Sequence, residues 1–445
     1  MGLSDEISKL MPANFGKNKA SKPLLHKTSK PAGIKPQQSS IGSFVSDGKQ
    51  TKPQQPELPP ESQSRVEESK GADALPSYFV PEEHCVQLKG HSKAVAALTW
   101  DASGARLLSG GYDGDVEFWD FGGMDRSFRP FRSVEPYEGH KVHDVQFTPS
   151  TGDRFLVVTS HPQAKLYDRD GVELQEYKQG DMYIRDMRRT KGHVSSINCC
   201  AWSPAARNTF LTGAADSTIR IWDAEHPIGH KQVLVLRTPK KGSRVACTAA
   251  RYSMDGGSIF SAQDDGAISV WAANGPYLRP SLHFESAHMA GTDTSGIACS
   301  RDGHTIVTRG GDDTVKVWDI RRLTSPVSSR AGLVSIYNHN NVIFSPEDER
   351  VIIVGTNVDK RGPESGSIRV LDRDTLEDIR TIPAIATPPD GKPQGGISVI
   401  RVEWHPKLNQ LAAACSDGVV RLWYDAERSV KGAKLCMEKK PKFRD

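Results

Sequence analysis

Apolar and polar positions alternate in short runs along most of the chain after about residue 84. The runs "DSTIRIW" (216–222), "DDTVKVW" (312–318) and "DGVVRLW" (417–423) place apolar residues at alternate positions before a tryptophan. A period of two is typical of a strand that buries one face. Because Gly and Asp turns separate these runs and helix signals are scarce, the pattern predicts an all-β domain.

The runs also recur at a regular distance. Five tryptophans stand six residues after an acidic turn residue: Trp119, Trp222, Trp271, Trp318 and Trp423. All except Trp423 also have a Ser or Thr ten residues upstream. Weaker copies place Tyr167 and Leu371 at the same position, so that successive anchors are 47 to 55 residues apart. A repeat of this length predicts a stack of similar four-stranded sheets, here seven of them.

Three of the repeats hold a complete set of polar partners. The set combines a His, a strand Ser or Thr, a turn Asp and the Trp, and its members are His91, Ser109, Asp113 and Trp119; His193, Thr212, Asp216 and Trp222; and His288, Thr308, Asp312 and Trp318. Buried polar groups are tolerated when each satisfies another, so we interpret each set as a structural hydrogen-bonded tetrad. This is the WD40 signature, and it predicts a seven-bladed β-propeller.

We place the propeller at residues 84–430. Residues 84–89 are expected to form the outer strand of the blade that 398–425 supply, because joining the two chain ends leaves no open sheet edge. Blades two, four, six and seven lack a full tetrad, and we expect apolar packing alone to hold them. Blade six carries a polar insertion at 357–367.

Two flanking segments have a different composition. Residues 1–80 are rich in Pro, Ser, Gln and Lys, which predicts a disordered tail, and residues 431–445 read as a short basic tail. Of the net charge of +4, residues 1–55 carry +6 and residues 431–445 carry +4, so the rest is mildly acidic. Contact with nucleic acid is therefore expected, at most, through the tails.

The chain shows no pattern of residues that predicts catalysis. No nucleophile and base, phosphate loop or metal-ligand spacing appears, so we expect no enzyme activity, no cofactor and no metal. No run of 18 apolar residues predicts a membrane span. The seven cysteines are irregularly spaced, with no CxxC, which favours reduced thiols inside a cell.

Blade five ends in a sequence that the fold does not require. After Trp318 come Asp319, Ile320, Arg321 and Arg322, whereas no other Trp-ended repeat has Arg at the position of Arg321. A guanidinium can make a planar, bidentate contact with a carboxylate of a partner, and Asp319 can orient it. A solvated surface arginine is the alternative interpretation.

Residues 306–321, "IVTRGGDDTVKVWDIR", resemble the WDxR box of WD40 substrate receptors for cullin-4 ubiquitin ligases. Segments such as "FWDFGGMD" (118–125), "AGTDTSGIACSRDG" (290–303) and "EWHPKLNQL" (403–411) extend the likeness: residues 84–436 resemble the gastrulation-defective family of WD-repeat proteins. In the box the resemblance implies that Trp318, Asp319, Ile320 and Arg321 contact the ligase's damaged-DNA-binding adaptor protein.

The same resemblance implies a nuclear, non-catalytic scaffold. It would act with the cullin-4 ligase in histone monoubiquitination and the DNA-damage response, as a monomer within a larger complex. The alternative is a scaffold in the pre-mRNA splicing machinery. The run "KKPK" (439–442) fits a short nuclear import signal.

Overall fold

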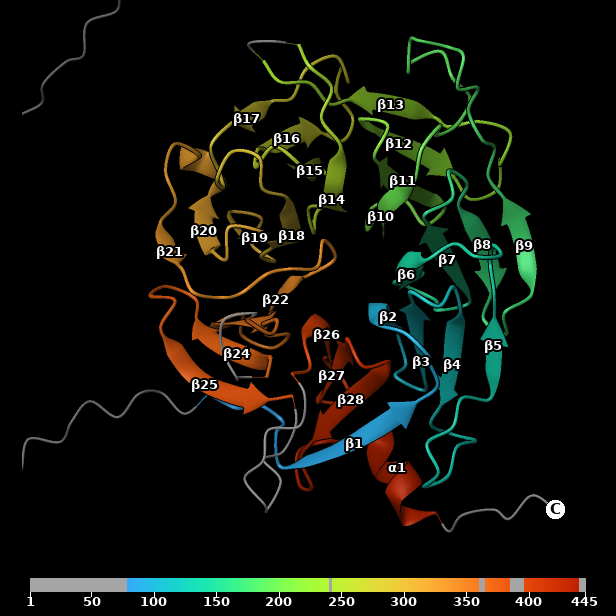
Figure 1. The fold of residues 1–445 in the computed structure, drawn as a ribbon, viewed down its shortest axis with the longest axis vertical. Coiled ribbons are helices and arrows are strands. Elements are labelled where there is room, and N and C mark those ends of the chain that lie inside the picture. Colours follow the sequence, from blue (N-terminus) through green and yellow to red (C-terminus); the bar gives the residue numbers. More distant parts are fainter. Residues whose placement is uncertain (1–77, 240–241, 360–364, 385–395, 440–445) are drawn as a thin grey trace, which may run out of the picture. The chain divides into compact units, whose positions relative to one another are not determined.

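The computed structural model describes residues 78–239, 242–359, 365–384 and 396–439. Within this part of the chain, seven four-stranded antiparallel sheets follow one another around a ring, each a blade of a β-propeller (Figure 1). Their inner strands contact one another in order around the centre. Positions 1–77, 360–364 and 440–445 lie outside the described ranges. Nearly all of the expected disordered tail, the middle of the blade-six insertion and the last six residues are therefore not described.

Each blade runs from an inner to an outer strand. Blade one is β2 (Val95–Trp100), β3 (Arg106–Gly111), β4 (Val116–Asp120) and β5 (Arg132–Val134); blade two is β6 (Val142–Phe147), β7 (Arg154–Thr159), β8 (Lys165–Asp168) and β9 (Glu173–Glu176); blade three is β10 (Ile197–Trp202), β11 (Thr209–Ala214), β12 (Thr218–Asp223) and β13 (Gln232–Val235); blade four is β14 (Cys247–Tyr252), β15 (Ser258–Gln263), β16 (Ile268–Ala272) and β17 (Leu282–Phe284).

The second half of the ring repeats this order. Blade five is β18 (Thr294–Cys299), β19 (Thr305–Gly310), β20 (Val315–Asp319) and β21 (Ser328–Arg330), with a 3-10 helix, η2 (Ile320–Arg322), after β20; blade six is β22 (Val342–Phe344), β23 (Val351–Gly355), β24 (Ser367–Asp372) and β25 (Asp378–Pro383); blade seven is β26 (Val399–His405), β27 (Gln410–Cys415), β28 (Val419–Tyr424) and β1 (His84–Lys89).

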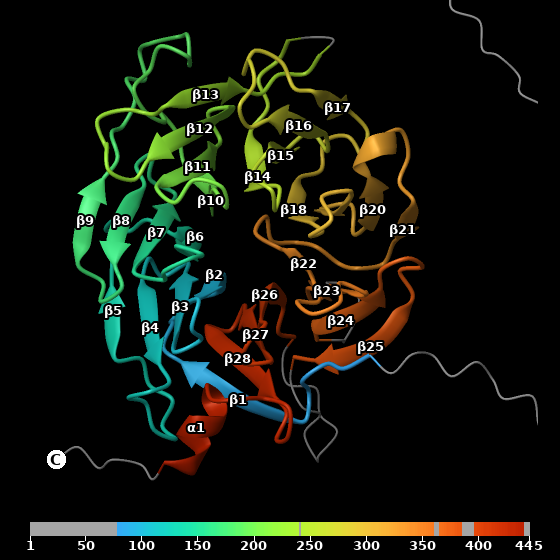
Figure 2. The same cartoon turned by 180° about the vertical axis from the view of Figure 1, so that it is seen from behind.

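The two ends of the propeller meet in blade seven. Strand β1 pairs antiparallel with β28, from His84 opposite Tyr424 to Lys89 opposite Val419 (Figure 2). Antiparallel pairing of the first strand with the last three satisfies the edge of β28, which would otherwise expose unpaired backbone groups. The ring is thus fastened by hydrogen bonds between its ends.

The core lies between neighbouring blades, where the apolar faces of adjacent sheets meet. One cluster joins Trp119 of blade one to Ala412 and Ala414 of blade seven. Another cluster joins Trp318 of blade five to Phe260 and Ile268 of blade four. The strand alternation in the sequence therefore buries each blade against the next rather than against one central core.

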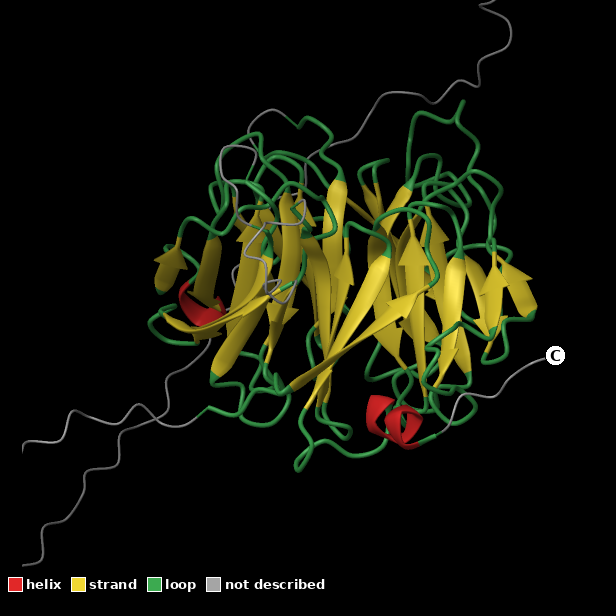
Figure 3. Ribbon diagram, turned by 60° about the horizontal axis from the view of Figure 1, so that its bottom comes forward, coloured by secondary structure: helices red, strands yellow, loops and turns green. Residues whose placement is uncertain are grey.

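Residues at the inner ends of both expected tails contact the propeller. Val80 is 5% exposed in the cluster shared by blades six and seven, and the Tyr78 hydroxyl donates to Asp372 at 2.9 Å. Beyond blade seven, residues 433–438 form helix α1 (Ala433–Glu438) (Figure 3). This helix places the buried Cys436 thiol 3.5 Å from the Phe121 carbonyl of blade one. Residues at the inner ends of both expected tails therefore bury apolar side chains on the ring.

Candidate functional site

In the three predicted tetrads the four polar side chains lie within hydrogen-bond distance of one another. In blade five, His288 Nδ1 is 2.9 Å from Asp312, His288 Nε2 is 2.9 Å from Thr308 Oγ1, and Trp318 Nε1 donates to the same hydroxyl at 2.9 Å. Blade one has these contacts at 3.1, 2.8 and 2.9 Å, and blade three at 2.9, 2.7 and 2.7 Å.

The order of donors in a tetrad follows from its chemistry. The carboxylate only accepts, so His288 Nδ1 carries the proton; Thr308 then accepts from the indole and donates its own proton to Nε2. Burial alone would raise the pKa of Asp113 in blade one, but hydrogen bonds from His91 and from the backbone N–H groups of Ser92 and Asp115 hold that pKa at about 2. Each tetrad therefore fixes the loop that carries the His to the strands of its blade.

The other blades are not held by apolar packing alone, and this prediction was wrong. Blade seven has an ion pair between Arg421 and Asp417 at 2.7 Å, with the Arg side chain only 5% exposed. In blade six, Asn340 donates to Asn357 at 2.8 Å. Polar side chains of other types thus replace part of the hydrogen bonding of the tetrad, because buried polar groups need partners.

Blade four keeps only part of a tetrad. Trp271 Nε1 donates to Ser261 Oγ at 3.2 Å, but the histidine is absent. Gln263 occupies the position that is Gly310 in blade five, and its amide donates to Ser269 Oγ at 2.8 Å. This arrangement leaves Gln263 Oε1 without a hydrogen-bond partner.

The predicted adaptor-binding residues lie at the end of β20 and in η2. Trp318 is fully buried, and Ile320 packs against the same cluster between blades four and five. Asp319 caps η2 by accepting the backbone N–H of Arg321 at 2.9 Å. The fold therefore explains Trp318 and Asp319, and it explains the partly buried side chain of Ile320.

Arg321 is the exposed member of the box. Its side chain is 66% exposed, and Nε and Nη2 donate to the two carboxylate oxygens of Asp319 at 3.0 and 2.9 Å. The hydrogen bond from Arg321 is the main reason that the pKa of Asp319 lies below its ordinary value. A guanidinium has five N–H donors, so three remain for a partner after the pair with Asp319 is made.

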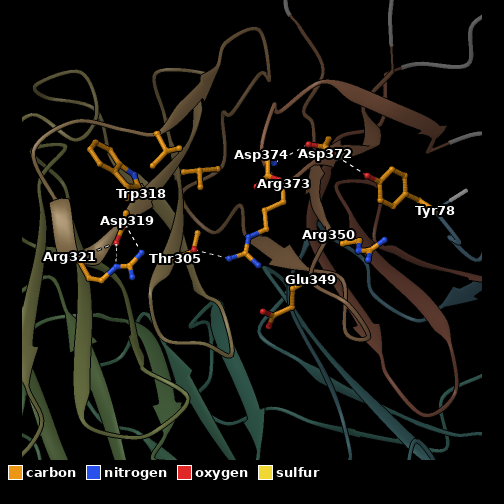
Figure 4. Close-up of a pocket in the computed structure, with 12 residues that line it drawn as sticks. Tyr78, Thr305, Trp318, Asp319, Arg321, Glu349, Arg350, Asp372, Arg373 and Asp374 are labelled. Carbon is orange, nitrogen blue, oxygen red and sulfur yellow. Dashed lines mark hydrogen bonds and ion pairs between the residues drawn. The ribbon is translucent and has the colours of Figure 1, made fainter. Parts of the chain in front are cut away.

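A cavity of about 520 Å³ lies beside Arg321, between blades five and six (Figure 4). Its blade-six wall holds Arg373, which donates to Thr305 of blade five at 2.7 Å, and Arg350. Tyr78 and Asp372 line the far end. The sequence-based search missed Arg350, Arg373 and Tyr78; the only signal was that Arg373 follows the Leu371–Asp372 pair, which corresponds to Trp318–Asp319.

The described residues hold no group of three His, Cys, Asp or Glu side chains that could bind a metal ion. No helix in the described part of the chain has the length and apolar character needed to cross a membrane. All seven cysteines are free, and Cys85 is the exposed one.

The chain resembles known proteins throughout the propeller. A family model for the WD domain, G-beta repeat, matches residues 82–120, 185–223, 280–319 and 389–424. WD repeat-containing protein 70 of Bos taurus is 41% identical over 81% of this chain and 53% of its own length, and that of Homo sapiens is 40% identical over 82% and 53%. Gastrulation defective protein 1 homolog of Drosophila melanogaster is 37% identical over 81% of the chain and 53% of its own length.

The chain thus spans about half the length of the curated relatives it matches. The matched family model describes a repeat and not a catalytic activity, and propellers of this type are typically interaction scaffolds. With seven blades, three full tetrads and homology along the whole ring, the chain belongs to the WD40-repeat proteins, and its propeller is homologous to those of WD repeat-containing protein 70 and the gastrulation defective homolog.

Proposed function

We propose that the propeller is a non-catalytic scaffold that joins a cullin-4 ubiquitin ligase through its adaptor protein and presents a second partner on another surface. The single observation that supports the adaptor contact is Arg321. Its guanidinium donates only to Asp319 among the described residues, and this pair holds it in one orientation at the protein surface. An oriented, exposed arginine loses less freedom on binding than a mobile one.

The cavity next to Arg321 adds to this support. Arginines at protein interfaces often dominate the binding energy when they enter a pocket or face one. Here Arg321, Arg350 and Arg373 border a cavity that also contains the carboxylates of Asp372 and Asp374. A partner surface with a carboxylate opposite Arg321 and a basic or polar group opposite the acids would match this distribution of charge.

Measured binding of the purified adaptor tests the proposal. Arg321→Ala should weaken adaptor binding by about 2 kcal/mol or more, which is roughly thirtyfold, because truncation of a central interface arginine commonly costs that much. Arg322→Ala is the matched control, since Arg322 lies in the same helix and is also exposed. Equal affinities for the two variants would remove the basis for the adaptor contact.

The site of action is part of the same proposal. Following the resemblance of the sequence, we place the protein in the nucleus, in histone monoubiquitination and the DNA-damage response. A fluorescent fusion should accumulate in nuclei and lose some of this preference when Lys439, Lys440 and Lys442 are replaced by Ala. Recovery of partners that disappear after nuclease treatment would instead favour a scaffold in the splicing machinery.

A further inference from the structure

A groove of about 810 Å³ separates the outer parts of blades three and four. One wall comes from blade three and its connections, and the other from β16, β17 and the loop between them; the outer strands β13 and β17 are neighbours at the rim of the ring (Figure 1). We call it the blade-four groove and define it by Arg188, Arg237, Gln263, Trp271, Arg279 and His283.

The floor of the groove contains two polar side chains with unused hydrogen-bonding atoms. Gln263 is 1% exposed, and its Nε2 donates to Ser269 Oγ while Oε1 has no partner. Ser269 Oγ lies 2.8 Å from His283 Nδ1, and the Nε2 of that histidine also has no partner. Buried polar atoms are rarely left without partners in a folded protein, so these two atoms indicate a missing ligand.

The chain of hydrogen bonds fixes what each unused atom offers. Ser269 has one hydroxyl proton, and His283 Nδ1 is the acceptor within its reach among the described residues, so the buried hydroxyl is satisfied when it donates to Nδ1. His283 therefore carries its own proton on Nε2 and offers a donor, while Gln263 Oε1 offers an acceptor. One donor and one acceptor in the same groove match the C=O and N–H groups of a peptide backbone.

The rim of the groove is basic, although the body of the chain is mildly acidic. Arg188, Arg237 and Arg279 are exposed, and their guanidinium groups form no ion pair with a described residue. The nearby acid, Asp186, is 3.6 Å from a different arginine, Arg189. Three unpaired guanidinium groups at one opening favour carboxylates on the ligand.

The wall that carries Arg188 is fixed to the propeller. Arg220 is fully buried in blade three and donates to the carbonyl groups of Met187 and Thr190 at 3.0 and 2.9 Å. A wall held in this way keeps Arg188 near the groove without a ligand, which lowers the cost of ordering on binding.

We propose that the blade-four groove binds an acidic, extended segment of a partner protein. Its peptide groups would meet Gln263 and His283, its carboxylates would face the three arginines, and an apolar side chain would contact Leu278, which is 66% exposed. Single-stranded nucleic acid fits less well, because bases stack on exposed aromatic rings and Trp271 is only 2% exposed. The proposal is independent of the adaptor contact at Arg321.

Selection from a random library of twelve-residue peptides displayed on phage tests the proposal with the whole chain as bait. The selected peptides should carry net negative charge and at least one large apolar residue. Their affinities, measured by fluorescence anisotropy, should fall about tenfold or more for the variant with Arg188→Glu, Arg237→Glu and Arg279→Glu. Arg322→Glu is the control for an equal change of surface charge per site and should change affinity less than about twofold.

A second variant tests the floor of the groove without altering its charge. Gln263→Met keeps most of the side-chain volume and removes both amide atoms, so we expect affinity for the selected peptides to fall about fivefold. Circular dichroism would establish that each variant is folded. The proposal is overturned if the library yields no binders, if binders ignore the arginine and Gln263 variants, or if a twelve-nucleotide oligouridine binds as tightly as the peptides and is lost in the arginine variant.

Discussion

Blades four and five are neighbours, and each is a four-stranded sheet with the same order of strands. Different side chains join these strands to the loop that enters each blade. In blade five, His288 fills the space above Gly310, whose added Cβ would collide with His288 and Asp312. In blade four the equivalent position is Gln263, whose larger side chain occupies this region instead. The tetrad therefore requires not only its four members but also a residue without a large side chain at a fifth position.

As a consequence, the two blades differ in the polar groups that they leave available to a partner. The polar atoms of the tetrad in blade five are satisfied internally, and its exposed feature is Arg321 at the strand end. Blade four has unpartnered atoms on Gln263 and His283 and borders a large groove. A blade without a full tetrad can thus offer a surface for recognition, because the polar side chains that stand in its place leave atoms available to a ligand.

A large side chain at this fifth position, in place of Gly310, should have the largest effect on the stability of the fold. Gly310→Gln should expel His288 from the tetrad and lower the free energy of unfolding by at least about 4 kcal/mol, since it combines overpacking with the loss of buried hydrogen bonds. Urea unfolding followed by circular dichroism would measure it. The reverse change, Gln263→Gly, should cost only about 1 kcal/mol; similar losses for both variants would contradict the requirement for a small residue.

Removal of the bridging hydroxyl should affect blade five more than blade four. Thr308→Val leaves both His288 Nε2 and Trp318 Nε1 buried without partners, which should cost about 3 kcal/mol. Ser261→Ala deprives only Trp271 of its acceptor and should cost about 1 kcal/mol. The same urea titration compares them, and a larger loss in blade four would show that the tetrad does not stabilise blade five as described.

Acid should weaken the tetrad of blade five. Burial alone would raise the pKa of Asp312, but hydrogen bonds from His288 and Thr314 outweigh it and lower that pKa. A carboxylate with a lowered folded pKa stabilises the fold above its unfolded pKa of about 4, and this stability is lost as the pH falls through the folded pKa. Asp312→Asn should therefore lower stability by about 2 kcal/mol at neutral pH, with the difference shrinking below pH 4.

Asp264 in blade four is the contrasting residue for this pH series. Burial raises the pKa of its carboxyl group, so its charged form opposes folding at neutral pH and this cost disappears as the pH falls. Asp264→Asn should leave stability at pH 7 unchanged or slightly higher. Stability curves from pH 7 to pH 2 that are parallel for the two variants would refute the assigned difference.

The sequence contained the information for the fold because each repeat carries its own signals. Alternating strands, the turn Asp six residues before the Trp, and the Ser or Thr ten residues before it are local spacings, and they located the strands and tetrads of blades one, three and five. The sequence also singled out Arg321, because the repeats can be compared position by position. Among the Trp-ended repeats, only the one that ends in Trp318 has Arg three residues after the Trp.

Other features depended on residues far apart in the chain, and only the tertiary structure decided them. Tyr78 and Val80 pack on blades six and seven, Cys436 reaches Phe121, and Arg373 joins the cavity beside Arg321 from the next blade. The unpartnered atoms of Gln263 and His283 became visible only when β15, β16 and β17 were side by side. The physical reason is that period and spacing report which face of a strand is buried, whereas the satisfaction of a polar atom depends on every neighbour that the folded chain brings to it.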